Sequence, residues 1–137
     1  MYESELVHER LAIRELLEAY ADAVCRVDAE AWAATWAEDG VWDQPEFPEF
    51  GTVRGRDKIV AAWKSAMQRF PGITFLNFVG TIQIEGERAN VRSYTLERYR
   101  DASTNTVFEM GCYEDVVIKR DGRWKFLLRR FLTKPSS

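Results

Sequence analysis

Hydrophobic and polar residues follow one period before Gly72 and a different period after it. From about Ser4 to Val24, apolar residues recur at helical spacing, which predicts an amphipathic first helix with one buried face. After Gly72 the pattern alternates residue by residue almost to the end of the chain, as half-buried strands do. The chain therefore divides into a helical part followed by a sheet.

Two further helices are predicted before the sheet. Asp28 stands directly before an Ala-rich stretch that ends at Gly40, the usual pairing of an N-cap with a C-terminal glycine, so a short second helix is expected there. Residues 56–70 carry an apolar stripe and stop at Pro71, which predicts a third helix with a clear breaker. Residues 41–55, rich in Pro, Gly and aromatic residues, are expected to form a short strand and a loop.

Turn sequences divide the alternating part into an antiparallel meander, with turns at 85–86, 102–105 and 121–122. The Asp-Gly turn at 121–122 is a strong hairpin signal, and a two-residue turn there determines how the last two strands pair. The predicted pairs are Lys119 with Trp124, Val117 with Phe126, Asp115 with Leu128, and Tyr113 with Arg130. One face of this hairpin is then largely aromatic and apolar.

The opposite face of that hairpin, where Arg129 is expected, is not wholly polar either, since it carries Val116, Ile118, Leu127 and Phe131. A sheet that is apolar on both faces needs two covers. The helices can cover one face and a second copy of the chain the other, so we predict a homodimer. The expected fold class is α+β, with three N-terminal helices packed in the concave face of a strongly curved antiparallel sheet, a half-open cone.

Length and composition limit the classes to which the protein can belong. Its 137 residues suit a single domain, 1–137, and 46% hydrophobic with 30% charged residues are ordinary globular values. Aromatic residues make up 13% and include five Trp, so large rings can build a core or line an apolar pocket. A net charge of −3 and a pI near 5.3 argue against binding to nucleic acid or an anionic membrane.

The sequence offers little to hold a metal or an organic cofactor, and none is expected. Cys25 and Cys112 lie far apart, His8 is the only histidine, and there is no glycine-rich phosphate loop. The acidic, amphipathic N-terminus is unlike a signal peptide, and no apolar run approaches the ~20 residues of a membrane span. A reduced, cytoplasmic setting is therefore expected.

Four segments, in their order and spacing, carry a resemblance to a known family: residues 13–43, 55–63, 84–96 and 111–130. Together they resemble the SnoaL-like domains of the nuclear transport factor 2-like superfamily, over nearly the whole chain. The resemblance implies the half-open cone. It does not select a function, because this fold hosts isomerases, dehydratases, cyclases, dehydrochlorinases and noncatalytic modules.

Asp28 has a counterpart in two enzymes of this superfamily. In scytalone dehydratase and the hexachlorocyclohexane dehydrochlorinase, an aspartate at the matching place orients a histidine that acts as base. The place of that histidine falls here on Asn77 or Phe75, depending on the strand register, so no histidine–aspartate dyad is present. Asp28 is either an N-cap alone or an N-cap that also serves the pocket.

Tyr20 matches the helix tyrosine of ketosteroid isomerases, which donates a hydrogen bond to a developing enolate oxygen. Asp115 falls near the strand aspartate that shares this task when an apolar site keeps it protonated. The general-base aspartate of that family aligns with Gln44, and Asp43 is one residue away. The alternative is that Tyr20 is a core aromatic and Asp115 pairs with a neighbouring arginine.

The candidate catalytic residues are thus Asp28, Tyr20, Asp115 and Asp43, and we expect Tyr20, Asp28 and Asn77 to approach one cavity. The candidate pocket residues, each with a core-only alternative, are Asn77, Trp32, Trp36, Trp42, Trp63, Met67, Phe75 and Tyr113. Alternation places Arg92 and Tyr94 on one face of the middle strands and Glu97 and Tyr99 on the other, with Glu109 as a further polar group nearby. Arg129 and Arg130 form salt bridges or hold an anionic group.

Two functions are compatible with these features. The first is a cofactor-free enzyme of isomerase, lyase or cyclase type, in which a carboxylate transfers a proton on a small apolar substrate in the cone, polycyclic molecules included. The second is a noncatalytic ligand-binding or assembly module, like the small subunit of aromatic-ring dioxygenases. A closed cavity with polar groups favours catalysis, whereas a filled cone favours assembly.

Overall fold

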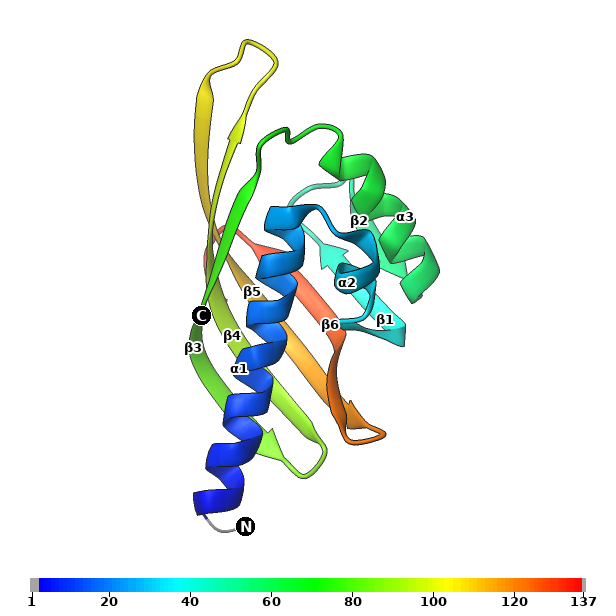
Figure 1. The fold of residues 1–137 in the computed structure, drawn as a ribbon, viewed down its shortest axis with the longest axis vertical. Helices are drawn as coiled ribbons and strands as arrows, with labels where there is room; N and C mark the ends of the chain where they lie inside the picture. Colours follow the sequence, from blue (N-terminus) through cyan, green and yellow to red (C-terminus); the bar gives the residue numbers. More distant parts are fainter. Residues whose placement is uncertain (1–2, 137) are drawn as a thin grey trace.

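The computed structural model describes residues 3–136 and contains three helices and six strands (Figure 1). The helices are α1 (Glu3–Arg26), α2 (Ala29–Ala33) and α3 (Arg56–Met67). The strands are β1 (Trp36–Gln44), β2 (Gly51–Arg54), β3 (Thr74–Glu85), β4 (Arg88–Arg100), β5 (Thr106–Arg120) and β6 (Arg123–Leu132). The first and third helices and the four-stranded meander confirm the predictions from hydrophobic period and turn sequences.

The strands form one sheet in the order β2-β1-β6-β5-β4-β3. All neighbours are antiparallel except β1 and β6, which run parallel. Figure 1 shows α1 lying along the sheet, α2 and α3 beside its β1–β2 end, and the β4–β5 hairpin projecting beyond the other strands. The predicted α+β class, with helices in the concave face of a curved sheet, is confirmed.

The predicted extent of the second helix is wrong, because α2 ends at Ala33 and the chain then enters β1. The Ala-rich sequence favours a helix locally, but Trp36 is fully buried and pairs with Phe126 of β6. Gly40 lies inside β1, where a Cβ atom would stand 2.8 Å from the Trp36 ring. The glycine is therefore needed for close packing, and tertiary pairing overrides helix propensity.

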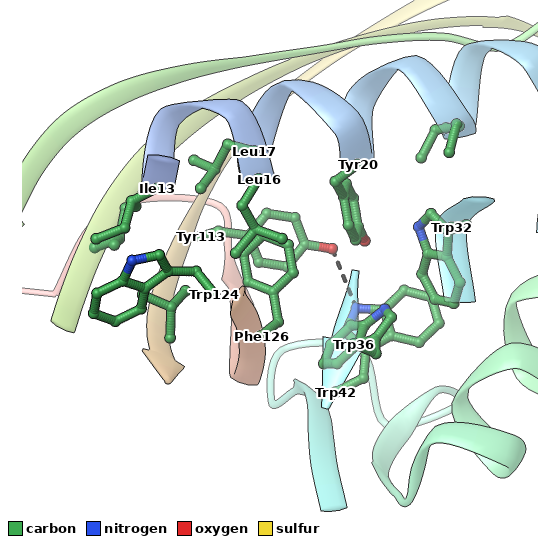
Figure 2. Close-up of a cluster of buried hydrophobic side chains, with 14 of the residues drawn as sticks. Ile13, Leu16, Leu17, Tyr20, Trp32, Trp36, Trp42, Tyr113, Trp124 and Phe126 are labelled. Atoms are coloured by element: carbon green, nitrogen blue, oxygen red, sulfur yellow. Dashed lines mark hydrogen bonds between the residues drawn. The ribbon is translucent and has the colours of Figure 1, made fainter. Parts of the chain in front are cut away.

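The core is a set of aromatic rings held between α1, α2, α3 and the inner face of the sheet (Figure 2). Trp32 of α2 stacks on Trp63 of α3, with ring centroids 4.6 Å apart and nearly parallel planes. Trp32 also contacts Trp36, and Tyr20 of α1 packs edge-on against Phe126. Because each large ring buries much apolar area, this cluster accounts for the high aromatic content.

A β-bulge in the last hairpin overturns half of its predicted register. The pairs Lys119–Trp124 and Val117–Phe126 are confirmed, whereas Val116 pairs with Leu128, which leaves Leu127 as an extra residue in β6. The predicted pairs beyond this point are wrong: Asp115 pairs with Arg129 and Tyr113 with Phe131, not with Leu128 and Arg130.

The bulge reverses which β6 side chains face inward. Arg129, expected on the outer face, is fully buried on the inner one, and Arg130 is exposed. Phe131 likewise lies on the inner face instead of beside Val116. A bulge adds curvature as well as an extra residue, so the bend of the cone and the inward arginine have one origin.

Candidate functional site

A cavity of about 120 Å³ lies at the end of the cone beneath the projecting β4–β5 hairpin. All three layers of the fold contribute to its wall: α1, α3 and the inner face of the sheet, together with the connections after β1 and α3. The lining residues are Tyr20, Val24, Trp42, Gln44, Phe47, Phe50, Trp63, Ala66, Met67, Phe70, Ile73, Phe75, Glu97, Glu109 and Phe131. The wall is mainly aromatic, and two glutamates are its charged members.

Glu97 and Glu109 occupy directly opposite positions on β4 and β5. Side chains at such positions have Cβ atoms about 4.5–5.5 Å apart, so the two carboxyl groups are neighbours. Glu97 is half-buried, and burial together with the charge of Glu109 raises its pKa to about 7. A carboxyl group with a pKa near neutrality in a cavity is a candidate general acid or base.

Tyr99 lies beside this pair and holds the carboxylate of Glu109 by a hydrogen bond. The Tyr99 hydroxyl donates a hydrogen bond of 2.9 Å to Oε1 of Glu109. Burial and the adjacent glutamates raise the pKa of Tyr99 to about 12, so it remains a donor at neutral pH. Glu109 is exposed at the cavity mouth and held by Tyr99, whereas Glu97 lies deeper.

The glutamate pair is absent from the predicted catalytic and pocket residues, although alternation along the strand predicts the correct face for Glu97. Glu97 and Tyr99 do lie on the face opposite Arg92 and Tyr94, and that face is the concave one. The pairing of Glu97 with Glu109 depends on the register of the hairpin formed by β4 and β5. Glu97 and Glu109 flank the predicted turn at 102–105 almost symmetrically, and this symmetry is the signal that pairs them.

Tyr20 serves both the core and the cavity. Figure 2 shows its side chain pointing from α1 toward the tryptophans of α2 and β1, and its ring packs on Phe75 of β3. It is 2% exposed and lines the cavity. Burial raises the pKa of the Tyr20 phenol, which is therefore protonated at neutral pH and able to donate a hydrogen bond.

Asp115 and Arg129 form a fully buried ion pair away from the cavity lining. Arg129 Nε lies 2.8 Å from Oδ1 and Nη2 2.9 Å from Oδ2 of Asp115, and Nη2 also donates to Oδ1 of Asn77 at 3.0 Å. The guanidinium carbon lies 3.8 Å from the ring centroid of Tyr113 and 4.4 Å from that of Tyr20. Burial raises the pKa of Asp115, and Arg129 opposes this rise. The structure thus shows the arginine-paired alternative for Asp115.

Asp28 lies outside the cavity lining, at the start of α2. Its Oδ1 accepts a 3.0 Å hydrogen bond from the backbone N–H of Ala31, and Oδ2 pairs with Arg26 at 3.0 Å. The backbone hydrogen bond is the main cause of a lowered pKa. The expectation that Tyr20, Asp28 and Asn77 meet in one cavity is wrong, because capping directs Asp28 to α2 and Arg129 holds Asn77.

Asp43 faces the outer side of the sheet, where it accepts from Thr52 Oγ1 at 2.9 Å and from Arg130 Nε at 3.0 Å. Gln44, the next residue, lines the cavity, as alternation along a strand requires. The position that resembles the isomerase base is therefore inward-facing but carries an amide. An amide cannot accept a proton from carbon at neutral pH, so Gln44 can only position a ligand.

The predicted pocket residues divide between wall and core. Trp42, Trp63, Met67 and Phe75 line the cavity. Trp32 and Trp36 are fully buried core residues outside its lining, as is the nearly buried Tyr113, whose hydroxyl accepts a 3.2 Å hydrogen bond from Trp42 Nε1 (Figure 2).

Among residues 6–136, whose side chains the structure describes, no group of three or more His, Cys, Asp and Glu side chains is arranged to hold a metal ion. None of the helices in this part of the chain is both long and apolar enough to cross a membrane.

Known structures share this fold. A proposed scytalone dehydratase from Novosphingobium aromaticivorans is 29% identical, with a TM-score of 0.81 over 96% of this chain and 87% of that one. A nuclear transport factor 2-like protein with a cystatin-like fold from the same organism is 25% identical, with a TM-score of 0.76 over 97% of this chain and 87% of that one. LinA, at 19% identity and a TM-score of 0.85 over 96% of this chain and 89% of that one, shows the fold alone.

No curated protein matches the sequence. The family model of the SnoaL-like domain, in contrast, matches residues 5–130, from the first turn of α1 to Arg130 of β6. This match spans the glutamate pair, Tyr20 and every strand of the sheet. The chain belongs to the SnoaL-like domain family.

Proposed function

We propose that this protein is a cofactor-free enzyme that transfers a proton on a small apolar molecule, with Glu97 as the proton-transferring group. The reaction is of the isomerase, lyase or cyclase type. The observation that carries the proposal is a half-buried carboxyl group with a pKa near 7 that lines an aromatic cavity. General bases are most effective when their pKa lies near the working pH.

The proposed step is removal of a proton from a carbon atom next to a carbonyl group. The Glu97 carboxylate takes the proton, the C–H electron pair moves into the carbonyl, and the resulting oxyanion accepts a hydrogen bond from the Tyr20 phenol. Glu97 then returns the proton to another carbon, or the electron pair expels a leaving group. Glu109 supports this step by raising the pKa of Glu97.

The cavity volume limits the size of the enclosed substrate. A protein cavity of about 150 Å³ binds benzene, so about 120 Å³ corresponds to roughly one ring. We therefore narrow the expectation of a polycyclic substrate to a molecule with about one enclosed ring. The similarity to a proposed scytalone dehydratase, whose name denotes elimination of water, supports the lyase class.

A noncatalytic ligand-binding or assembly module is the second candidate. It is favoured by the extent to which Trp32, Trp36 and Phe126 fill the cone, leaving a cavity smaller than the usual ~300–1,000 Å³ of ligand sites. The two candidates differ in whether a bound ketone exchanges its α-protons.

Proton exchange tests the proposal without knowledge of the natural substrate. The protein is incubated in D₂O with one-ring ketones, and loss of the α-proton signals is followed by NMR. The wild type is expected to accelerate exchange and Glu97→Gln to abolish the acceleration, because an amide cannot take the proton.

Asp28→Asn and Asp43→Asn are the matched controls, since both remove a carboxylate outside the cavity and both should exchange like the wild type. Exchange that persists in Glu97→Gln would eliminate Glu97 as the base. Ketone binding without exchange in the wild type would favour the noncatalytic module.

A further inference from the structure

The charge of the cavity wall is of one sign. Glu97 and Glu109 are its two charged residues, and no Lys, Arg or His among residues 6–136 lines it. The remaining wall is dominated by ring faces and edges, from Tyr20, Trp42, Phe47, Phe50, Trp63, Phe70, Phe75 and Phe131. Aromatic rings present negative faces, so the rings and the carboxylates both favour a positively charged ligand.

Two arginines pack on wall residues without lining the cavity. Arg129 is held by Asp115 in a two-point ion pair on the inner face. Arg69 follows α3 and lies 5.3 Å from the ring centroid of Phe50, a wall residue, without itself lining the cavity.

The raised pKa of Glu97 is consistent with the lack of a positively charged side chain in the cavity wall. Burial and repulsion by Glu109 are the causes that raise its pKa to about 7, and no cation is among the causes that act on it. Among the described residues, the hydrogen bond from Tyr99 is the one side-chain interaction of the pair, and it goes to Glu109. The cavity thus holds carboxylates that a positively charged guest would stabilise.

We propose that the cavity binds an apolar molecule of about one ring that carries a protonated amine, held between Glu97, Glu109 and the surrounding ring faces. Glu109 is exposed and Glu97 half-buried, so the ammonium group lies toward the mouth and the ring deeper in the cavity. This inference rests on the proposed function in taking the same cavity as the substrate site, and it adds the charge class of the substrate.

A bound ammonium group also has a consequence for the proposed reaction. An adjacent positive charge favours the ionised form of a carboxyl group. The substrate would therefore place Glu97 in the base form that proton removal requires, whereas a carboxylate-bearing molecule would be repelled and would keep Glu97 protonated.

Three probes of matched size and different charge test the inference: benzylamine, benzyl alcohol and benzoate. Binding is followed by tryptophan fluorescence, to which Trp42 and Trp63 of the cavity wall contribute, and by calorimetry at neutral pH. We expect benzylamine to bind about tenfold more tightly than benzyl alcohol, and benzoate more weakly than the alcohol.

The double variant Glu97→Gln/Glu109→Gln should lose the preference for the amine and keep its affinity for the alcohol. Glu85→Gln/Glu87→Gln changes the net charge equally at exposed positions outside the cavity lining and should bind all three probes like the wild type.

Equal affinity for amine and alcohol in the wild type would overturn the inference and leave the proposed proton transfer standing. An amine preference that survives in the cavity double variant would overturn it too. If none of the three probes binds, the cavity is not a site for one-ring ligands, and the inference fails together with the proposed function.

Discussion

The environment of Glu97 lowers the stability of the folded chain and also suits the side chain to proton transfer. Its side chain is half-buried, faces another carboxylate and has no cation acting on it, so its charged form is disfavoured. The same features bring its pKa close to 7, where a carboxyl group can both accept and return a proton. Carboxyl groups with such a shifted pKa are common at functional sites.

This arrangement predicts a specific pH dependence of stability. The pKa of Glu97 is about 7 in the folded chain against 4.5 ordinarily, so between these values the folded chain retains a proton that the unfolded chain releases. Stability therefore falls as pH rises through this window. Glu97→Gln should unfold with nearly wild-type free energy at pH 4 and be more stable by on the order of 2 kcal/mol at pH 8.

Urea unfolding at several pH values measures this difference, with Glu87→Gln as an exposed control that should show no such trend. A gain in Glu97→Gln that does not grow with pH would contradict the assigned environment of Glu97.

Arg129 and Arg130 are adjacent in sequence, but their replacement should destabilise the fold to very different extents. Arg129 is fully buried with Asp115, whereas Arg130 is 44% exposed with Asp43. Arg129→Met leaves an unpaired buried carboxylate and should destabilise the fold by about 3–5 kcal/mol, while Arg130→Met should cost less than about 1 kcal/mol. Denaturant unfolding compares them.

The double variant Asp115→Leu/Arg129→Met removes both charges and should recover much of the loss, because the penalty comes from the unpaired charge. Equal losses in the two single arginine variants would show that Arg129 is not held as described.

At the scale of elements, the bulge at Leu127 connects the shape of the sheet to the wall of the cavity. It turns Phe131 inward, and Gly111 of β5 makes room for that ring. A Cβ atom at position 111 would lie far inside contact distance of the Phe131 ring. One extra residue and one missing side chain together shape this part of the site.

Gly111→Ala should therefore destabilise the protein by about 1–3 kcal/mol, since the Phe131 ring is packed against Tyr113 and has to move. Thermal unfolding measures the loss. Phe131→Leu removes the clashing ring atoms. Gly111→Ala should therefore cost less stability when it is added to Phe131→Leu than when it is added to the wild type. No recovery in the double variant would mean that Gly111 is required for a different reason.

At the scale of the whole molecule, the convex face of β3, β4 and β5 is apolar and uncovered. Phe78 pairs with Tyr94 across the strands, and Met110 lies opposite Leu96. Met110 is 74% and Phe108 66% exposed. The residues on which the dimer prediction was based are less exposed, with Val116 and Leu127 half-buried, so the convex face of β3–β5 is the better candidate surface.

We accordingly propose a homodimer through this face, and expect sedimentation at micromolar concentration to give twice the mass of the chain. Phe108→Lys/Met110→Lys should shift the protein to monomer, whereas Val7→Lys, an exposed position on α1, should not. A wild-type chain that sediments cleanly as a monomer would contradict the proposal.

Features that depend only on neighbouring residues could be predicted from the sequence. The structure has the local features: the 3.6-residue period of α1 and α3, the Asp28 cap and the turn at 121–122. The end of α3 differs, because the helix stops at Met67, before the predicted limit at Pro71. The order of these elements predicted the fold class, and alternation placed Glu97 opposite Tyr94 on the strand. These conclusions required no knowledge of which segments meet.

Features that depend on residues far apart in the chain became visible only in the folded structure. Parallel pairing with β6 turned the Ala-rich stretch around Trp36 from helix to strand, and the bulge at Leu127 sent Arg129 inward to Asp115. The cavity itself required α1, α3 and five strands to converge, which made Glu97 the candidate base and left Asp28 as a cap. Local pattern cannot specify such outcomes, because non-local packing and pairing energies exceed local preferences.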